Sequence, residues 1–129
     1  MSEFRDQTVV IGVGPERGLG ATLCRRFAAA GHHVWVAGRS REKLDDTVAT
    51  IEAAGGVATA HVADATDEAQ LVALFDAVEA AGGRLACAIY NVGNNTPGRI
   101  HDMDADYFEK SWRVGCFGGF LFAREAVRR

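Results

Sequence analysis

The sequence has few cysteines and no recognisable pattern among them. Cys24, Cys87 and Cys116 are odd in number, widely separated and set among apolar neighbours. Cysteines of this kind are usually buried, reduced thiols, so we expect neither disulfides nor a cysteine metal cage. The histidines also lack the spacing of zinc ligands, and no metal site is predicted.

Long hydrophobic runs are missing as well. The start, MSEFRDQTVV, carries charges on both sides of Phe4, and the apolar run that follows has only the length of a strand. Such a run is too short for a signal peptide or a membrane span, so we expect a cytoplasmic protein without a membrane partner. With a formal charge of -3, neither sign is in large excess, and nucleic acid is not an expected partner.

Strand and helix signals alternate along the chain, whose 129 residues suit a single domain with an ordinary core. Four short apolar stretches are typical of parallel strands covered on both faces, and they span residues 8–13, 33–38, 57–63 and 85–92. The repeated strand-helix order predicts an α/β fold, a doubly wound parallel sheet with helices on both faces. Apolar stripes of helical period should face this sheet: Leu19, Leu23 and Phe27; Leu44, Val48 and Ile51; Leu71, Leu74, Phe75 and Val78.

Candidate helix boundaries accompany this pattern. Ser40 and Thr66 are expected to be the N-caps of the second and third helices. Gly115, Gly118 and Gly119 each cost about 1 kcal/mol relative to alanine in a helix interior, so the last helix is irregular there or another element packs very closely. Glycines expected to end helices are Gly31, Gly55, Gly56, Gly82 and Gly83. Apolar residues on or near one side of the last helix are Phe108, Trp112, Phe120, Ala123 and Val127.

The turn after the first strand has the form G-x-x-x-G-x-G, with Gly14, Gly18 and Gly20 as its glycines and Leu19 between the last two. A pyrophosphate at a helix N-terminus gains exposed N–H groups and the positive end of the dipole, and glycine lets the backbone come close. Between a strand and a helix, this turn favours a nucleotide site, and the alternative is a glycine-rich turn without a ligand. No G-K-[ST] follows, which excludes a standard phosphate-loop NTPase.

The end of the second strand indicates which nucleotide is bound. Arg39, followed by Ser40, stands where a carboxylate would meet a free ribose 2′-hydroxyl, and no carboxylate occurs between Gly20 and Arg39. An arginine there suits a 2′-phosphate, and Arg17 in the glycine turn would add a second positive charge. NADP(H) is therefore favoured over NAD(H), unless Arg39 is only a solvated loop residue. The negative charge of Glu16 in the same turn would repel a bound phosphate unless its side chain points outward.

Four motifs, in this order, resemble the short-chain dehydrogenase/reductase family: GPERGLG, GRS, ADATD and NVG, one after each strand. The resemblance covers the N-terminal, cofactor-binding half of a usual member. It implies a Rossmann-type sheet of four strands in the order 3-2-1-4, truncated relative to the family. Residues 1–129 would form one dinucleotide-binding domain that lacks the catalytic and substrate half.

The same resemblance implies which residues contact the cofactor. Tyr90 departs from the family by replacing the first asparagine of its N-N-A-G motif, and Asp64 has the structural alternative of capping the third helix. The implied contacts are Gly14, Gly18 and Gly20 with the pyrophosphate, Asp64 and the Ala65 backbone with adenine, and Asn91, Val92 and Gly93 with the riboses.

Catalytic residues are not predicted in this chain. The family uses a serine, a tyrosine and a lysine four positions after that tyrosine, and these lie beyond the part that the sequence resembles. Gly115 stands where the family has a proton-relay asparagine, and Tyr107 and Lys110 are three positions apart. One interpretation is the cofactor half of an NADP(H)-dependent oxidoreductase that moves a hydride between nicotinamide and a carbonyl or alcohol carbon. The alternative is a non-catalytic nucleotide-binding or assembly module.

Assembly is expected because the family's fourth strand is internal, whereas here it would be an apolar edge with unpaired N–H and C=O groups. By resemblance, the last helix belongs to a bundle between subunits. We expect a homo-oligomer through the last helix or the exposed fourth strand, or else a fragment of a longer parent. Phe117, Phe120 and Phe122 suit burial there.

Overall fold

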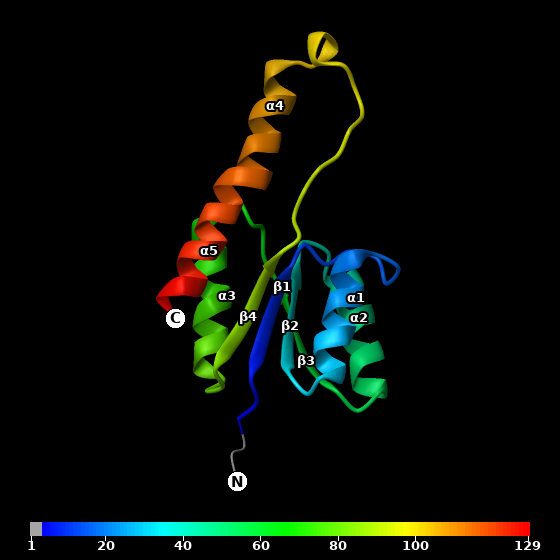
Figure 1. Cartoon of the computed structure of the whole chain (residues 1–129), viewed down its shortest axis with the longest axis vertical. Coiled ribbons are helices and arrows are strands. Elements are labelled where there is room, and N and C mark those ends of the chain that lie inside the picture. The colour runs from blue at the N-terminus through cyan, green and yellow to red at the C-terminus, as the bar shows by residue number, and fades with distance from the viewer. Residues whose placement is uncertain (1–3) are drawn as a thin grey trace.

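Four parallel strands form the centre of the computed structural model, which describes residues 4–129 (Figure 1). Residues 1–3 of the predicted domain lie outside the described residues. The strands lie in the order β3-β2-β1-β4, so the predicted doubly wound sheet is confirmed. Their bounds are β1 Gln7–Ile11, β2 His33–Gly38, β3 Val57–Val62 and β4 Leu85–Tyr90.

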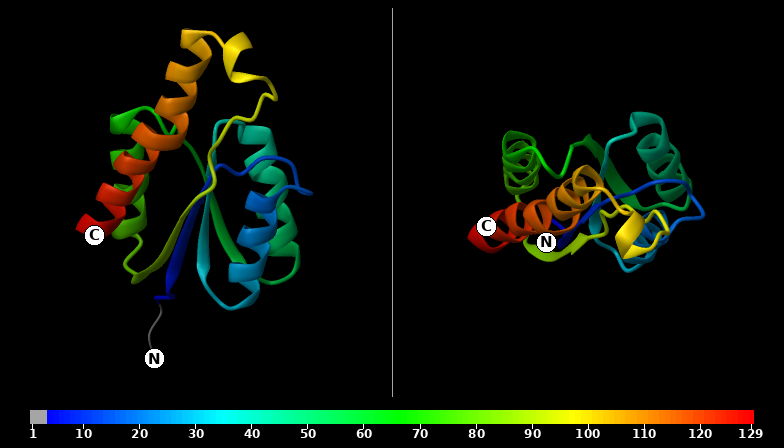
Figure 2. Two further views of the ribbon diagram at one scale, coloured as in Figure 1. Left: turned by 45° about the horizontal axis from the view of Figure 1, so that its top comes forward. Right: turned by 90° about the horizontal axis from the view of Figure 1, so that it is seen from above.

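Helices cover both faces of the sheet, as Figure 2 shows from above. Helices α1 and α2 pack on one face, and α3 and α5 pack on the other. Within residues 4–129, no helix is both long and apolar enough to cross a membrane. The helical elements are α1 Leu19–Ala29, α2 Arg41–Ala53, α3 Glu68–Ala80, η1 Ile100–Asp102, α4 Ala105–Trp112, η2 Arg113–Phe117 and α5 Gly118–Arg128.

The central strand contributes to two separate hydrophobic clusters because successive side chains of a strand point to opposite faces. Val10 belongs to the cluster under α1 and α2, whereas Val9 and Ile11 belong to the cluster under α3 and α5. Both sides of the strand are therefore apolar, which explains why its sequence does not alternate with polar residues.

The predicted apolar stripes are right for α3 and partly wrong for α1. Leu71, Leu74, Phe75 and Val78 of α3 are all buried. In α1, however, Leu19 is 62% exposed, while Leu23 and Phe27 are partly buried at the margin of their cluster. The buried face of α1 lies one position further along the chain and consists of small residues, which lets the helix approach the sheet closely: Gly20, Ala21, Cys24 and Ala28.

The caps of α2 and α3 differ from expectation. Ser40 occupies the N-cap position of α2, but its side chain makes no capping hydrogen bond. Thr66 is not the cap of α3. That cap is Asp67, whose carboxylate accepts from the Gln70 N–H at 3.2 Å. The helix ends are as predicted, with the left-handed backbone that favours glycine at Gly31, Gly55 and Gly82.

The last helix is irregular, as its glycines predicted. Elements α4, η2 and α5 follow one another without a break (Figure 1), and η2 is a single π turn. Glycine is needed at Gly118, where an added Cβ would stand 2.8 Å from the Ala65 carbonyl oxygen. Phe122 is buried within this chain, whereas Phe120 is 58% exposed, and its expected burial against another subunit stays a prediction. The side with Phe108, Trp112, Phe120, Ala123 and Val127 is exposed to solvent.

The cysteines are free, but they are not all buried. Cys24 is buried on the sheet-facing side of α1, Cys87 is half-buried on β4, and Cys116 is exposed. The expectation of a buried thiol is therefore wrong for Cys116, because this residue lies in the π turn on a side that none of the described elements covers.

Candidate functional site

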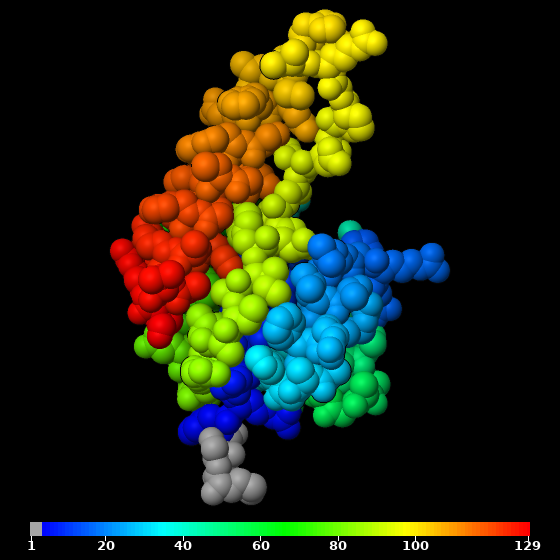
Figure 3. Space-filling view, in the orientation of Figure 1, coloured from blue at the N-terminus to red at the C-terminus, as the bar shows by residue number. Residues whose placement is uncertain are grey.

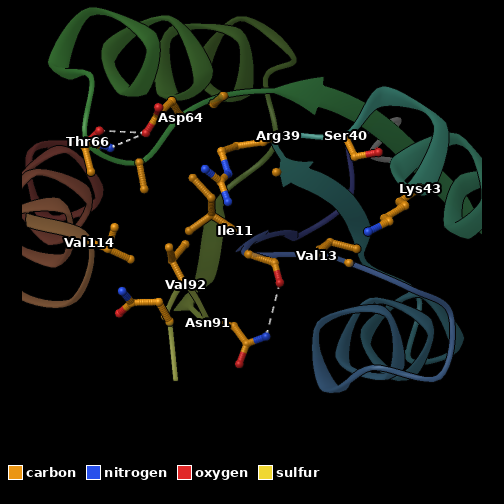
Figure 4. A pocket seen from close by; sticks show the side chains of 17 residues that line it. Ile11, Val13, Arg39, Ser40, Lys43, Asp64, Thr66, Asn91, Val92 and Val114 are labelled. Atoms are coloured by element: carbon orange, nitrogen blue, oxygen red, sulfur yellow. Dashed lines mark hydrogen bonds between the residues drawn. The ribbon is translucent and has the colours of Figure 1, made fainter. Parts of the chain in front are cut away.

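A cavity of about 420 Å³ opens at the carboxyl ends of the strands (Figure 4). Each strand contributes the residues that follow it, among them Gly14, Arg39, Asp64 and Asn91. The strand order reverses between β1 and β4, and ligands of open α/β sheets bind at such a point. The motifs identified in the sequence thus meet around one space.

Gly12 and Asn91 form the floor of the cavity between β1 and β4. Gly12 has a φ of +93° and turns the chain out of β1, so the strand ends at Ile11 rather than at Val13. The Asn91 N–H donates to the Ile11 carbonyl at 2.9 Å, and its side-chain Nδ2 donates to the Gly12 carbonyl at 3.2 Å. The sequence analysis missed Gly12, although a glycine directly after the first strand was a usable signal.

The three glycines of the predicted turn have different surroundings. Gly14 lines the cavity, and a Cβ on it would meet no atom within 4 Å. Gly18 donates its N–H to the Pro15 carbonyl at 2.8 Å and forms the N-cap of α1. Gly20 is buried, and a Cβ there would stand 2.8 Å from the Gly12 carbonyl oxygen. Gly14 therefore leaves room for a ligand, while Gly20 lets α1 approach β1.

The rest of the glycine turn does not line the cavity. Arg17 and Leu19 are exposed, and neither they nor Gly18 and Gly20 line the cavity. The Glu16 carboxylate accepts a hydrogen bond from the Thr50 hydroxyl on α2. Glu16 is thus turned outward, which removes its opposition to a bound phosphate.

Positive charge gathers at the rim formed by the end of β2 and the start of α2. Arg39, Ser40 and Lys43 line the cavity, and Figure 4 shows the Arg39 and Lys43 side chains reaching toward it. Within residues 4–129, neither Arg39 nor Lys43 has a hydrogen bond or an ion pair. The sequence analysis missed Lys43, although it stands one helical turn after Arg39, in the first turn of α2.

Asp64 is the single carboxylate among the described residues that line the cavity. It accepts hydrogen bonds from the N–H and the hydroxyl of Thr66 at 2.9 and 2.8 Å. These bonds, with a contribution from the positive charge of Arg39, hold the pKa of Asp64 below its usual value. Asp64 therefore stabilises the turn before α3 rather than capping that helix, and Ala65 follows it along the cavity wall.

The opposite side of the cavity comes from the segment after β4 and from η2. Val92, Gly93 and Asn94 line it, together with Val114 of the π turn. Figure 4 shows Val114 across the cavity from Ser40 and Lys43. Beyond Asn94, the chain as far as α4 stands clear of the body of the molecule (Figure 3).

Comparisons with known proteins agree with this geometry. A family model described as short chain dehydrogenase matches residues 8–129. Sorbitol-6-phosphate 2-dehydrogenase of Escherichia coli strain K12 is 34% identical over 122 residues, which cover 93% of this chain and 47% of that relative. 3beta-hydroxysteroid dehydrogenase 1 of Eggerthella lenta is 32% identical over 126 residues, with 97% and 48% covered. The crystal structure of a short-chain dehydrogenase from Rhodopseudomonas palustris matches with a TM-score of 0.87 at 37% identity, over 95% of this chain and 57% of that one.

The chain spans about half the length of the curated relatives it matches. Within that span, the family model covers nearly every residue, and the resemblance inferred from the four strand-end motifs is confirmed. This protein is therefore a member of the short chain dehydrogenase family.

Proposed function

We propose that this chain is the dinucleotide-binding domain of an oxidoreductase and that it binds NADP(H) in preference to NAD(H). The observation that carries the preference is the pair of cations at the cavity rim, Arg39 and Lys43, which have no hydrogen bond or ion pair within residues 4–129. Cations that form no hydrogen bond or ion pair beside a cavity are suited to an anionic group of a ligand.

The rim suits a 2′-phosphate better than a 2′-hydroxyl. A ribose hydroxyl is usually recognised by a carboxylate at the end of the second strand, and Arg39 stands there instead. The Ser40 hydroxyl makes no capping bond and is able to donate to a phosphate oxygen. The N-terminus of α2, which begins at Arg41, adds the positive end of a helix dipole.

The remaining cofactor contacts follow the cavity wall. Gly14 leaves open space where a pyrophosphate would approach the N-terminus of α1. We propose that Arg17, Gly18, Leu19 and Gly20 act through the conformation and dipole of that helix start. Adenine would lie against Asp64 and Ala65, and the riboses against Asn91, Val92 and Gly93.

Hydride transfer between nicotinamide and a carbonyl or alcohol carbon is the chemistry that the bound cofactor supplies. The 129 residues contain no Tyr-x-x-x-Lys segment, and Gly115 offers no side chain for a proton relay. We therefore propose that these residues by themselves bind the cofactor without completing the reaction. A non-catalytic nucleotide-binding module is the alternative.

We also propose that the protein is cytoplasmic and forms a homo-oligomer. Strand β4 is hydrogen-bonded to β1 on one edge only among the described strands. Phe108 and Trp112 on α4 and Phe120 on α5 are exposed apolar side chains of a kind that subunit interfaces bury. Sedimentation velocity over a range of concentrations tests this proposal, and a folded monomer at every concentration would contradict it.

Titration of the chain with NADPH and with NADH, followed by isothermal calorimetry, tests the cofactor preference. We expect NADPH to bind at least about tenfold more tightly, a difference of about 1.4 kcal/mol, and Arg39→Ala to remove most of that gap. Arg26→Ala is the matched control, because Arg26 is exposed on α1 and does not line the cavity. Equal affinity for the two cofactors would contradict the preference, and binding of neither would contradict the function.

A further inference from the structure

Glu16, the single acidic residue of the glycine turn, is held from two helices. Its carboxylate accepts a hydrogen bond from the Thr50 hydroxyl on α2, and its backbone carbonyl accepts one from Arg25 Nη1 on α1 at 2.9 Å. The Thr50 hydroxyl also lies 3.1 Å from the carbonyl of Asp46, one turn earlier in α2. Figure 1 shows the turn as the blue loop that projects beside the start of α1. Both the side chain and the backbone of Glu16 are therefore fixed.

The residues that hold Glu16 lie outside the cavity at the strand ends. Thr50 and Arg25 line a second cavity, of about 330 Å³, between α1 and α2, and neither lines the first one. Arg25 is also fixed within α1, because its Nη2 donates to the Thr22 hydroxyl at 3.1 Å. That hydroxyl donates in turn to the Gly18 carbonyl at 2.9 Å. An effect of Thr50 on a ligand in the first cavity must therefore pass through Glu16.

The start of α1 is open to an anion. Its N-cap is Gly18, which has no capping side chain, and no acidic residue lies in the first turn of the helix. The exposed N–H groups and the positive end of the dipole attract a negative charge. Glu16 stands two residues before this N-cap and is the nearest carboxylate along the chain. If its side chain turned toward these N–H groups, it would compete with a pyrophosphate for them.

We propose that Thr50 is a positioning residue for cofactor binding, because it holds the Glu16 carboxylate away from the N-terminus of α1 and leaves that end free for the pyrophosphate. This inference rests on the proposed function. Glu16 is then a competitor of the cofactor within the chain itself, and one hydrogen bond from α2 restrains it. Without the Thr50 hydroxyl, Arg25 would hold only the backbone of Glu16, and the carboxylate would be released.

Calorimetry on the full chain with NADPH tests this inference. We expect Thr50→Val to weaken NADPH binding about threefold, as the interaction of one carboxylate with a helix N-terminus allows. Glu16→Gln by itself should change the affinity little. Added to Thr50→Val, it should restore the affinity, because the released side chain no longer carries a charge. If Thr50→Val only loosened the packing of α2, Glu16→Gln would not restore binding.

Thr47→Val is the matched control on the same helix. Thr47 lies three residues before Thr50, its hydroxyl is buried without a hydrogen-bond partner within residues 4–129, and it does not line the cavity at the strand ends. The control therefore removes a threonine hydroxyl that holds no other group. We expect it to leave NADPH affinity unchanged.

A measurement without a ligand follows the carboxylate directly. The amide NMR signals of Leu19 and Gly20 report on charge near the start of α1. Glu16→Gln should shift these signals clearly in the Thr50→Val chain, where the carboxylate is free to approach them. The same substitution should shift them much less in the unmodified chain, where Thr50 holds the carboxylate elsewhere.

Weakened binding in Thr50→Val that Glu16→Gln does not restore would overturn the inference, as would unchanged affinity in Thr50→Val. Failure of the unmodified chain to bind NADPH would instead contradict the proposed function. In that case the amide signals still test the role of Thr50, and equal shifts in the two chains would overturn it. Restored binding together with the larger shift in the Thr50→Val chain would support the inference.

Discussion

Gly12 and Asn91 hold the ends of β1 and β4 at a fixed separation. The Asn91 side-chain amide donates to the Gly12 carbonyl at 3.2 Å, and a Cβ on Gly12 would stand 2.5 Å from the Asn91 carbonyl carbon. Gly12 and Asn91 are therefore joined by a hydrogen bond, and their backbones are also in close van der Waals contact. This contact lies at the floor of the cavity, so it couples the stability of the sheet to the shape of the site.

Gly12→Ala should be strongly destabilising. A φ of +93° is unfavourable for alanine, and its methyl group would overlap the Asn91 backbone. Together these effects should lower the free energy of unfolding by at least about 2 kcal/mol, measured by urea denaturation. A loss below about 0.5 kcal/mol, as for an ordinary surface change, would mean that the two strand ends separate easily.

Gly14→Ala, two residues further on, should behave in the opposite way. Its methyl group would enter open space, so we expect unfolding free energy to change by less than about 0.5 kcal/mol. The same methyl group would stand where the backbone approaches a pyrophosphate, and NADPH binding should weaken by about tenfold or more. Unchanged affinity in this variant would place the pyrophosphate elsewhere.

Glu125 should make the protein sensitive to acid. Its side chain is 3% exposed and accepts from Arg124, Arg128 and Arg129 at 3.1 to 3.2 Å. Burial opposes its charge, but the hydrogen bonds from Arg129 and Arg124 outweigh this and lower its pKa below the ordinary 4.5. A carboxyl group whose pKa is lower in the folded protein stabilises the fold at pH values above its ordinary pKa. This stabilisation is lost as the pH falls through the lowered pKa.

We therefore expect Glu125→Gln to reduce the free energy of unfolding at pH 7 by about 2 kcal/mol. The difference in unfolding free energy between the variant and the unmodified protein should narrow as the pH falls below about 4.5. Urea denaturation at several pH values measures it. Glu109→Gln, which changes an exposed carboxylate on α4, should show no such gap. A difference for Glu125→Gln that is constant across this pH range would contradict the assigned pKa.

Cys24 and Cys116 should differ in their reactivity toward alkylating reagents. Burial raises the pKa of the Cys24 thiol to about 12, whereas Cys116 is exposed. Because the thiolate is the reactive form, iodoacetamide at about pH 8 should modify Cys116 first and reach Cys24 only after unfolding, as peptide mass spectrometry would show. Cys116→Ser should remove the rapid labelling. Rapid labelling of Cys24 in the folded protein would mean that α1 opens readily.

Much of the fold could be predicted because its signals are local. Continuous apolar strands and the glycines at Gly31, Gly55 and Gly82 are visible along the chain, and they determine where elements begin and end. The predicted face of α1 was wrong because small residues such as Ala21 and Cys24 pack more closely than Leu19. The spacing of large hydrophobic residues in a sequence does not show that a helix packs on the sheet through its small residues instead.

The site was predicted to the extent that its residues follow strands. Arg39, Asp64 and Asn91 meet because parallel strands end at one edge of a sheet. Lys43 was missed because it belongs to a helix, and its direction depends on how α2 sits on the sheet. Val114 was missed for a similar reason, since only the π turn brings it to the cavity.

The placement of β1 between two clusters has a consequence for hydrogen exchange. β1 is hydrogen-bonded to β2 on one side and to β4 on the other, and its side chains enter both clusters. Its amide hydrogens are therefore released only when both halves of the molecule come apart, so they should be the slowest to exchange with deuterated solvent. Amides of α4, which has no buried residue, should exchange long before them. If β1 and α4 exchanged together, α4 would open only when the sheet opens, and the protein would unfold as a single unit.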